Sequence, residues 1–113
     1  MRRGRRMGGR MMGPMMDPRS KFFMALASDQ RIKILESLKK GEKSSADLIS
    51  VLELDPSVVS RHLMMLRNVG LVSARKEGVA LYFALADDRV LEVLDLATQI
   101  TKDWFSRFQH FFR

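Results

Sequence analysis

Cysteine is absent from the 113-residue sequence. This absence excludes disulfide bonds, thiolate metal sites and thiol redox switches, and it is compatible with a reducing compartment. No run of about 18 apolar residues occurs, and glycine and proline interrupt the methionines near the N-terminus, so neither a membrane-spanning helix nor a secretory signal is expected. We therefore expect a cytoplasmic protein.

Histidine is scarce, because His62 and His110 are the only two and lie far apart along the chain. No Ser-His-Asp set and no pair of carboxylates occurs at a spacing suited to catalysis. We therefore expect no enzyme, no metal site and no cofactor. His62 is expected to be buried or bonded to the backbone rather than to bind a metal.

Positive charge is concentrated at the N-terminus. The formal net charge is +7, and residues 1–19 hold six arginines and one aspartate, which is five of the seven excess charges. Such an imbalance implies an anionic partner. Hydrophobic residues make up 46 % of the sequence, which at this length suits one domain with one core.

Residues 1–18 contain only Met, Arg, Gly, Pro and Asp, so we predict a disordered tail there and a folded domain over residues 19–113. An arginine arm on DNA phosphates or in a minor groove is one function for the tail. A methionine Cu(I) site and an RNA-binding arginine-glycine tail are the alternatives. Translation could also start at one of the later methionines, which would leave the tail without a function.

The apolar spacing after residue 19 predicts three short helices. The first contains Phe22 and Phe23, and the second is capped by Ser28 and ends before Gly41. Arg31 in the second helix suits a structural ion pair better than a DNA contact. The third helix is capped by Ser44 or Ser45, both of which are placed to touch DNA phosphates.

Residues 55–70 predict one well-bounded helix, with Asp55 as its N-cap, Pro56 in its first turn and Gly70 after its end. Its apolar stripe consists of Val59, Leu63, Leu66 and Val69. The residues of this helix predicted to contact DNA are Ser57, Val58, Ser60, Arg61, Met64 and Asn68. Short polar side chains let a helix enter a major groove closely, whereas a surface helix on a small core is the alternative.

After Gly70 the apolar period changes from 3.6 to 2, which predicts a β-hairpin with strands at residues 71–76 and 79–85 and a turn at Glu77-Gly78. A hairpin directly after a recognition helix is a wing. Its basic residues, Arg75 and Lys76, are predicted to contact DNA, or alternatively to form a charged tip that prevents aggregation. The apolar face predicted to pack on the helices consists of Val79, Leu81, Phe83 and Leu85.

A last helix starts at Asp87 or Asp88 and carries a heptad seam. The seam residues, predicted to lie in a dimer interface, are Val90, Leu94, Ala97, Thr101, Trp104, Phe108 and Phe111. This is more apolar surface than a small domain can cover, so a partner is implied, and the simplest partner is a second copy.

The sequence resembles the ArsR/SmtB family of winged-helix repressors over residues 19–100. The matching segments are 23–27 (FMALA), 31–35 (RIKIL), 47–48 (DL), 59–63 (VSRHL), 66–72 (LRNVGLV) and 77–83 (EG, then LYF). The resemblance implies an α+β winged helix-turn-helix with four helices, a hairpin wing and a long C-terminal dimerisation helix. It also implies that the first helix, with Phe22 and Phe23, pairs with the last in a homodimer that binds two-fold symmetric DNA.

The family's metal-sensing positions are not matched. Ile49 and Val51 stand where a well-known arsenite and cadmium site has cysteines, and from Asp88 the zinc pattern meets Val90, Thr101 and Trp104 instead of ligands. We therefore expect a dimeric repressor without a metal inducer, which binds an inverted repeat through residues 56–69 and the wing at 75–80. The alternative is a winged-helix architectural or interaction module that binds DNA non-specifically through its basic tail.

Overall fold

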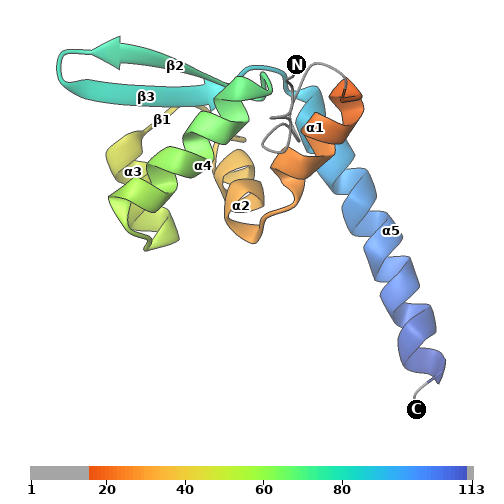
Figure 1. Cartoon of the computed structure of the whole chain (residues 1–113). Coiled ribbons are helices and arrows are strands. Elements are labelled where there is room, and N and C mark those ends of the chain that lie inside the picture. The colour runs from red at the N-terminus through yellow and green to blue at the C-terminus, as the bar shows by residue number, and fades with distance from the viewer. Residues whose placement is uncertain (1–15, 112–113) are drawn as a thin grey trace, which may run out of the picture.

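The computed structural model describes residues 16–111, with side chains up to Gln109, and it has the expected α+β winged-helix architecture (Figure 1). Most of the expected tail lies outside this range. Within the range, the elements are α1 (Pro18–Leu26), α2 (Asp29–Ser37), β1 (Lys43–Ser44), α3 (Ser45–Leu52), α4 (Pro56–Asn68), β2 (Val72–Glu77), β3 (Ala80–Leu85) and α5 (Arg89–Phe111).

The helix starts follow the expected capping residues. The side chains of Ser28, Ser44 and Asp55 accept hydrogen bonds from the backbone N–H groups of the first turns of α2, α3 and α4. Asp17 does the same for α1, with Pro18 in the first turn. Asp17 and Pro18, which the sequence placed in the predicted tail, therefore belong to the start of α1.

The sheet has three antiparallel strands in the order β1-β3-β2. The two-residue strand β1 was not expected, and it pairs Lys43 with Phe83. In the hairpin Glu77 pairs with Ala80, so the turn is Gly78-Val79, one residue later than predicted. Gly78 has φ +62°, a left-handed value that favours glycine and suits this tight turn.

One core lies where the helices meet the base of the sheet. Its buried residues are Ala25, Leu26, Ile34, Leu35, Leu38, Leu48, Val59, Leu63, Leu66, Leu71, Val72, Phe83 and Val90. Only the base of the hairpin reaches this core. The prediction that Val79 and Leu81 pack on the helices is wrong, because these side chains are 101 % and 42 % exposed and the hairpin extends past the helices that would cover them.

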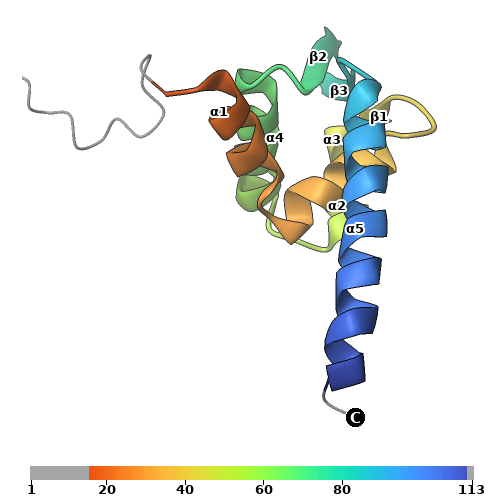
Figure 2. The ribbon, with the colours of Figure 1, turned by 90° about the vertical axis from the view of Figure 1, so that its right-hand side faces the viewer.

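Helix α5 starts on this core and then projects away from the body (Figure 2). Its cap is Asp87, whose carboxylate forms an ion pair with the Arg89 side chain at 2.7 Å and accepts from the Arg89 backbone N–H at 3.0 Å. These contacts lower the pKa of Asp87 to about 2. Val90, predicted to lie in the dimer interface, is only 3 % exposed and belongs to the core of its own chain, so little of its side chain is left for a partner.

Candidate nucleic-acid interface

Helices α3 and α4 pack against each other and form a helix-turn-helix. Glu53, with φ 55°, ends α3 and turns the chain toward Asp55, which caps α4. Val59, Leu63 and Leu66 anchor α4 on the core. The opposite face of α4 is therefore left to solvent, as its sequence predicts.

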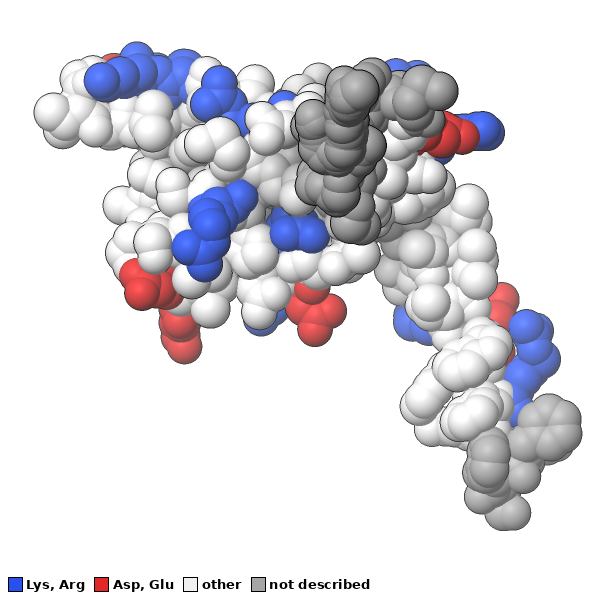
Figure 3. Space-filling view, in the orientation of Figure 1, with Lys and Arg blue, Asp and Glu red and all other residues white. Residues whose placement is uncertain are grey.

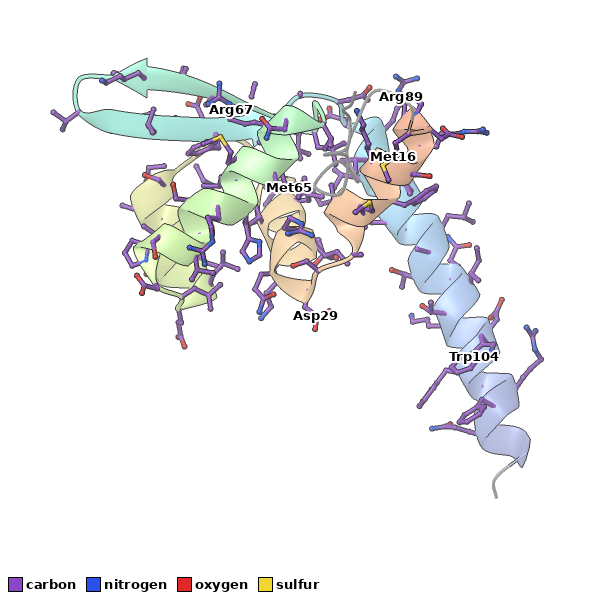
Figure 4. The ribbon with its side chains drawn as sticks, viewed as in Figure 1. Met16, Asp29, Met65, Arg67, Arg89 and Trp104 are labelled. Carbon is purple, nitrogen blue, oxygen red and sulfur yellow. The ribbon has the colours of Figure 1, made fainter. Side chains whose placement is uncertain are left out.

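The predicted contact residues of α4 lie on that outer face with one exception. Those exposed are Ser57, Ser60, Arg61, Met64 and Asn68. Val58 is half-buried. The outer face of α4 borders an open hollow of about 440 Å³ that is also lined by Arg31, His62 and Met65. In Figure 4, Arg67 marks the end of α4 nearest the base of the hairpin.

Basic side chains gather on the hairpin and over the middle of the face seen in Figure 3, whereas acidic side chains lie along the lower edge of the body. An anion that approaches this face meets the wing and α4 first. This distribution suits a phosphate backbone that passes along α4 toward the wing.

The guanidinium of Arg75 is already bound within the protein. It donates to both carboxylate oxygens of Glu42 at 2.7 and 2.8 Å, donates to Glu77, and lies 4.7 Å from the Tyr82 ring centroid. These partners raise the pKa of Arg75, and Arg75 lowers the pKa of Glu42. Lys76 is exposed, and among the residues that the structure describes no carboxylate lies within ion-pair distance of it. The free positive charge of the wing therefore belongs to Lys76.

Ser44 and Ser45 lie at the N-terminus of α3 and are half-buried. The Ser44 hydroxyl oxygen accepts from the Asp47 backbone N–H at 3.0 Å, and this bond does not use its O–H proton, which is the group that a phosphate oxygen would accept. Sequence reasoning identified this cap correctly. It missed Glu42, because the loop before a two-residue strand carries no local signal that a wing arginine will bind there.

In the part of the chain that the structure describes, Arg31 does not form the predicted ion pair with a carboxylate. Its Nε donates to the Ala25 carbonyl at 2.6 Å, its Nη2 donates to the Met24 carbonyl at 3.1 Å, and its Nη1 lies 3.2 Å from Nδ1 of His62. Burial lowers the pKa of His62, and the charges of Arg31 and Arg61 lower it further. His62 is thus a neutral, half-buried partner of an arginine. Among the side chains that the structure describes, those of residues 16–109, no group of three or more metal-ligating residues is found.

The predicted dimer residues separate into two groups. Phe22 and Leu94 pack partly against the core of their own chain, whereas Phe23 is 59 % exposed. Farther along α5, Ala97, Thr101, Trp104 and Phe108 are exposed, and the rings of Trp104 and Phe108 stack with centroids 5.0 Å apart. The side chain of Phe111 lies outside the described residues. Neighbouring Leu96, Ile100 and Phe105 are also more than half exposed and widen this apolar face of α5.

Comparisons with known proteins match the same region. The model of the family described as "Bacterial regulatory protein, arsR family" matches residues 28–74, which contain α2, α3, α4 and the start of β2. A protein of Streptomyces lividans named probable mercury resistance operon repressor is 36 % identical over 87 residues, which cover 77 % of this chain and 70 % of that protein.

Two solved structures share the fold. The crystal structure of Rv0081 from Mycobacterium tuberculosis has a TM-score of 0.72 at 33 % identity, and the match covers 79 % of this chain and 90 % of that chain. The solution NMR structure of Mb0332 from Mycobacterium bovis, described as a homodimeric winged helix-turn-helix DNA-binding domain, has a TM-score of 0.71 at 26 % identity. That match covers 80 % of this chain and 84 % of that chain.

Proposed function

Because this chain belongs to the arsR family of bacterial regulatory proteins, we propose that it is a homodimeric repressor that binds an inverted-repeat DNA site through α4 and the wing. The observation that carries the proposal is the outer face of α4. It combines exposed short hydroxyls with Arg61 and lies beside a basic hairpin. A helix of this kind fits a major groove, where arginine reads guanine through two hydrogen bonds.

Each contact has a distinct role in this proposal. Ser57, Ser60, Arg61, Met64 and Asn68 face base edges or the adjacent phosphates, with Val58 behind them. Ser44, Ser45 and the N-terminus of α3 contact the DNA backbone and set the position of the protein without reading sequence. Lys76 contacts a phosphate directly. Arg75 contacts a phosphate by giving up its ion pair with Glu42. Because that ion pair is exposed, breaking it costs little free energy.

The dimer is supported by the apolar face of α5. The distal half of α5 projects beyond the body, yet Trp104 and Phe108 lie on it stacked and about half exposed (Figures 2 and 4). Isolated helical turns are only marginally stable in water, and large aromatic side chains gain most when they are buried. A second copy that packs on this face, with the exposed Phe23 of α1 beside it, would both stabilise the projecting part of α5 and bury its aromatic side chains. The homodimeric relative supports the same assembly.

Repression is supported by the Streptomyces lividans relative, which is named as a probable repressor. The mechanism would be steric, because a dimer on an inverted repeat covers about one turn of DNA on each side of its axis. Promoter occupation therefore blocks transcription wherever the site overlaps the polymerase footprint.

The test is selection of bound duplexes from a random pool, followed by binding curves on the selected site and on random duplex at several salt concentrations. We expect an inverted repeat with half-sites about 10 base pairs apart. Arg61→Ala should lose about ten- to a hundredfold in affinity for the selected site and much less for random duplex. Lys33→Ala, an exposed change on α2, is the matched control. Equal binding to all duplexes would instead favour an architectural module that uses its basic tail.

A further inference from the structure

Arg31, which lies on α2, contacts both α1 and α4. From the first turn of α2 it donates to the carbonyls of Met24 and Ala25, in the last turn of α1, and it contacts the ring of His62 on α4. Helix α1 packs on α2, and α2 packs on α4. The guanidinium therefore spans the junction of the three helices, and a single planar group fixes the distance between the end of α1 and the middle of α4.

The chemistry of the contact sets the state of His62. Arginine has only donors, so Nδ1 of His62 must accept, and the proton of the neutral ring must lie on Nε2. His62 sits between the buried stripe of α4 and its exposed face, next to Arg61 in sequence and beside it in the hollow. Because His62 belongs to the same turn of α4 as Arg61 and Ser60, its contact with Arg31 restrains how far the helix that carries them can rotate or tilt.

We infer that Arg31 is a positioning residue for operator recognition: through its bonds to the α1 carbonyls and to His62 it fixes the orientation of α4 relative to α1. The inference rests on the proposed function, in which α1 and α5 form the dimer and α4 reads DNA. In such a dimer, the angle between α1 and α4 sets the separation of the two recognition helices. The Arg31–His62 contact thus determines how strictly the protein discriminates the spacing of half-sites.

The test uses the full-length protein and four variants. His62→Leu removes the acceptor and keeps an apolar side chain at the site, whereas His62→Asn offers a carbonyl oxygen close to the position of Nδ1. Arg31→Lys keeps the charge but cannot span the three acceptors, and Arg31→Met removes the charge. Affinity is measured for the selected inverted repeat, for versions with one base pair added or removed between the half-sites, and for random duplex. Melting temperature and sedimentation report the fold and the dimer.

We expect His62→Leu and Arg31→Lys to lower the preference for the correct spacing by about tenfold or more, the loss expected for one hydrogen bond to a charged group. His62→Asn should restore most of that preference. The dependence of binding on salt should stay unchanged in every variant, because Arg31 and His62 neutralise no phosphate in this scheme. If the arginine variants fail to fold, the comparison of His62→Leu with His62→Asn tests the inference by itself, because Arg31 keeps its bonds to the end of α1 in both His62 variants.

Two results would overturn the inference while the proposed function stands. One is an unchanged spacing preference in His62→Leu, and the other is a salt dependence reduced by about one phosphate in Arg31→Met, which would make Arg31 a DNA contact. A wild-type protein that selects no inverted repeat would overturn both the inference and the proposed function.

Discussion

Replacement of Trp104 by alanine should weaken the dimer strongly. Trp104 is 54 % exposed in the single chain. For a tryptophan that can bury about 250 Å², this leaves about 135 Å² to be covered by the partner. A two-fold interface contains the residue twice, so about 270 Å² at about 25 cal/mol per Å² gives an upper limit of about 7 kcal/mol. Truncations at interface centres cost about 2–4 kcal/mol, so we expect the dimer Kd to rise about 30- to 1000-fold.

Sedimentation equilibrium of the wild type and of Trp104→Ala measures this Kd directly. Ser106→Ala is the matched control, because Ser106 lies on the same part of α5 and on its opposite, polar face. The double change Trp104→Glu with Phe108→Glu should abolish the dimer, since it places four charges in the interface. The reasoning fails if the wild type sediments as a monomer at micromolar concentration, or if Trp104→Ala and Ser106→Ala associate equally well.

Four further outcomes are expected. Glu42→Gln should tighten DNA binding and Arg75→Gln should weaken it, because Glu42 competes with phosphate for Arg75. Weaker binding in both variants would instead mean that the ion pair serves to hold the wing in place. Deletion of residues 1–15 should weaken binding to all duplexes and reduce its salt dependence, whereas an unchanged slope would mean that the tail makes no DNA contact. Zinc, cadmium and arsenite should not release the selected duplex; release by one equivalent would reveal an unrecognised site. The pKa of His62 in the folded protein lies below its ordinary 6.5, so near that pH the unfolded chain binds more protons than the folded one. The free energy of unfolding should therefore decrease as the pH falls below about 6.5. His62→Asn should remove this part of the decrease in melting temperature.

The sequence by itself determined the elements whose signals are local. The Asp55 cap, Pro56 in the first turn and Gly70 after the last turn bound α4, because these residues satisfy or end the backbone hydrogen bonds of their own helix. The switch from a period of 3.6 to 2 predicted the hairpin. The exposed polar face of α4 followed as well, since its apolar residues fall on one side of the helix.

Only the tertiary structure decided which distant groups meet. Strand β1 exists because Lys43 pairs with Phe83, and two residues carry no strand signal of their own. Glu42 binds Arg75, which lies 33 residues away in the sequence, and Arg31 contacts His62, which lies 31 residues away. Val90 and Trp104 share one apolar spacing, yet the first is buried and the second projects past the body. A helical period fixes which side chains share a face, but the position of the helix relative to the core decides what covers that face.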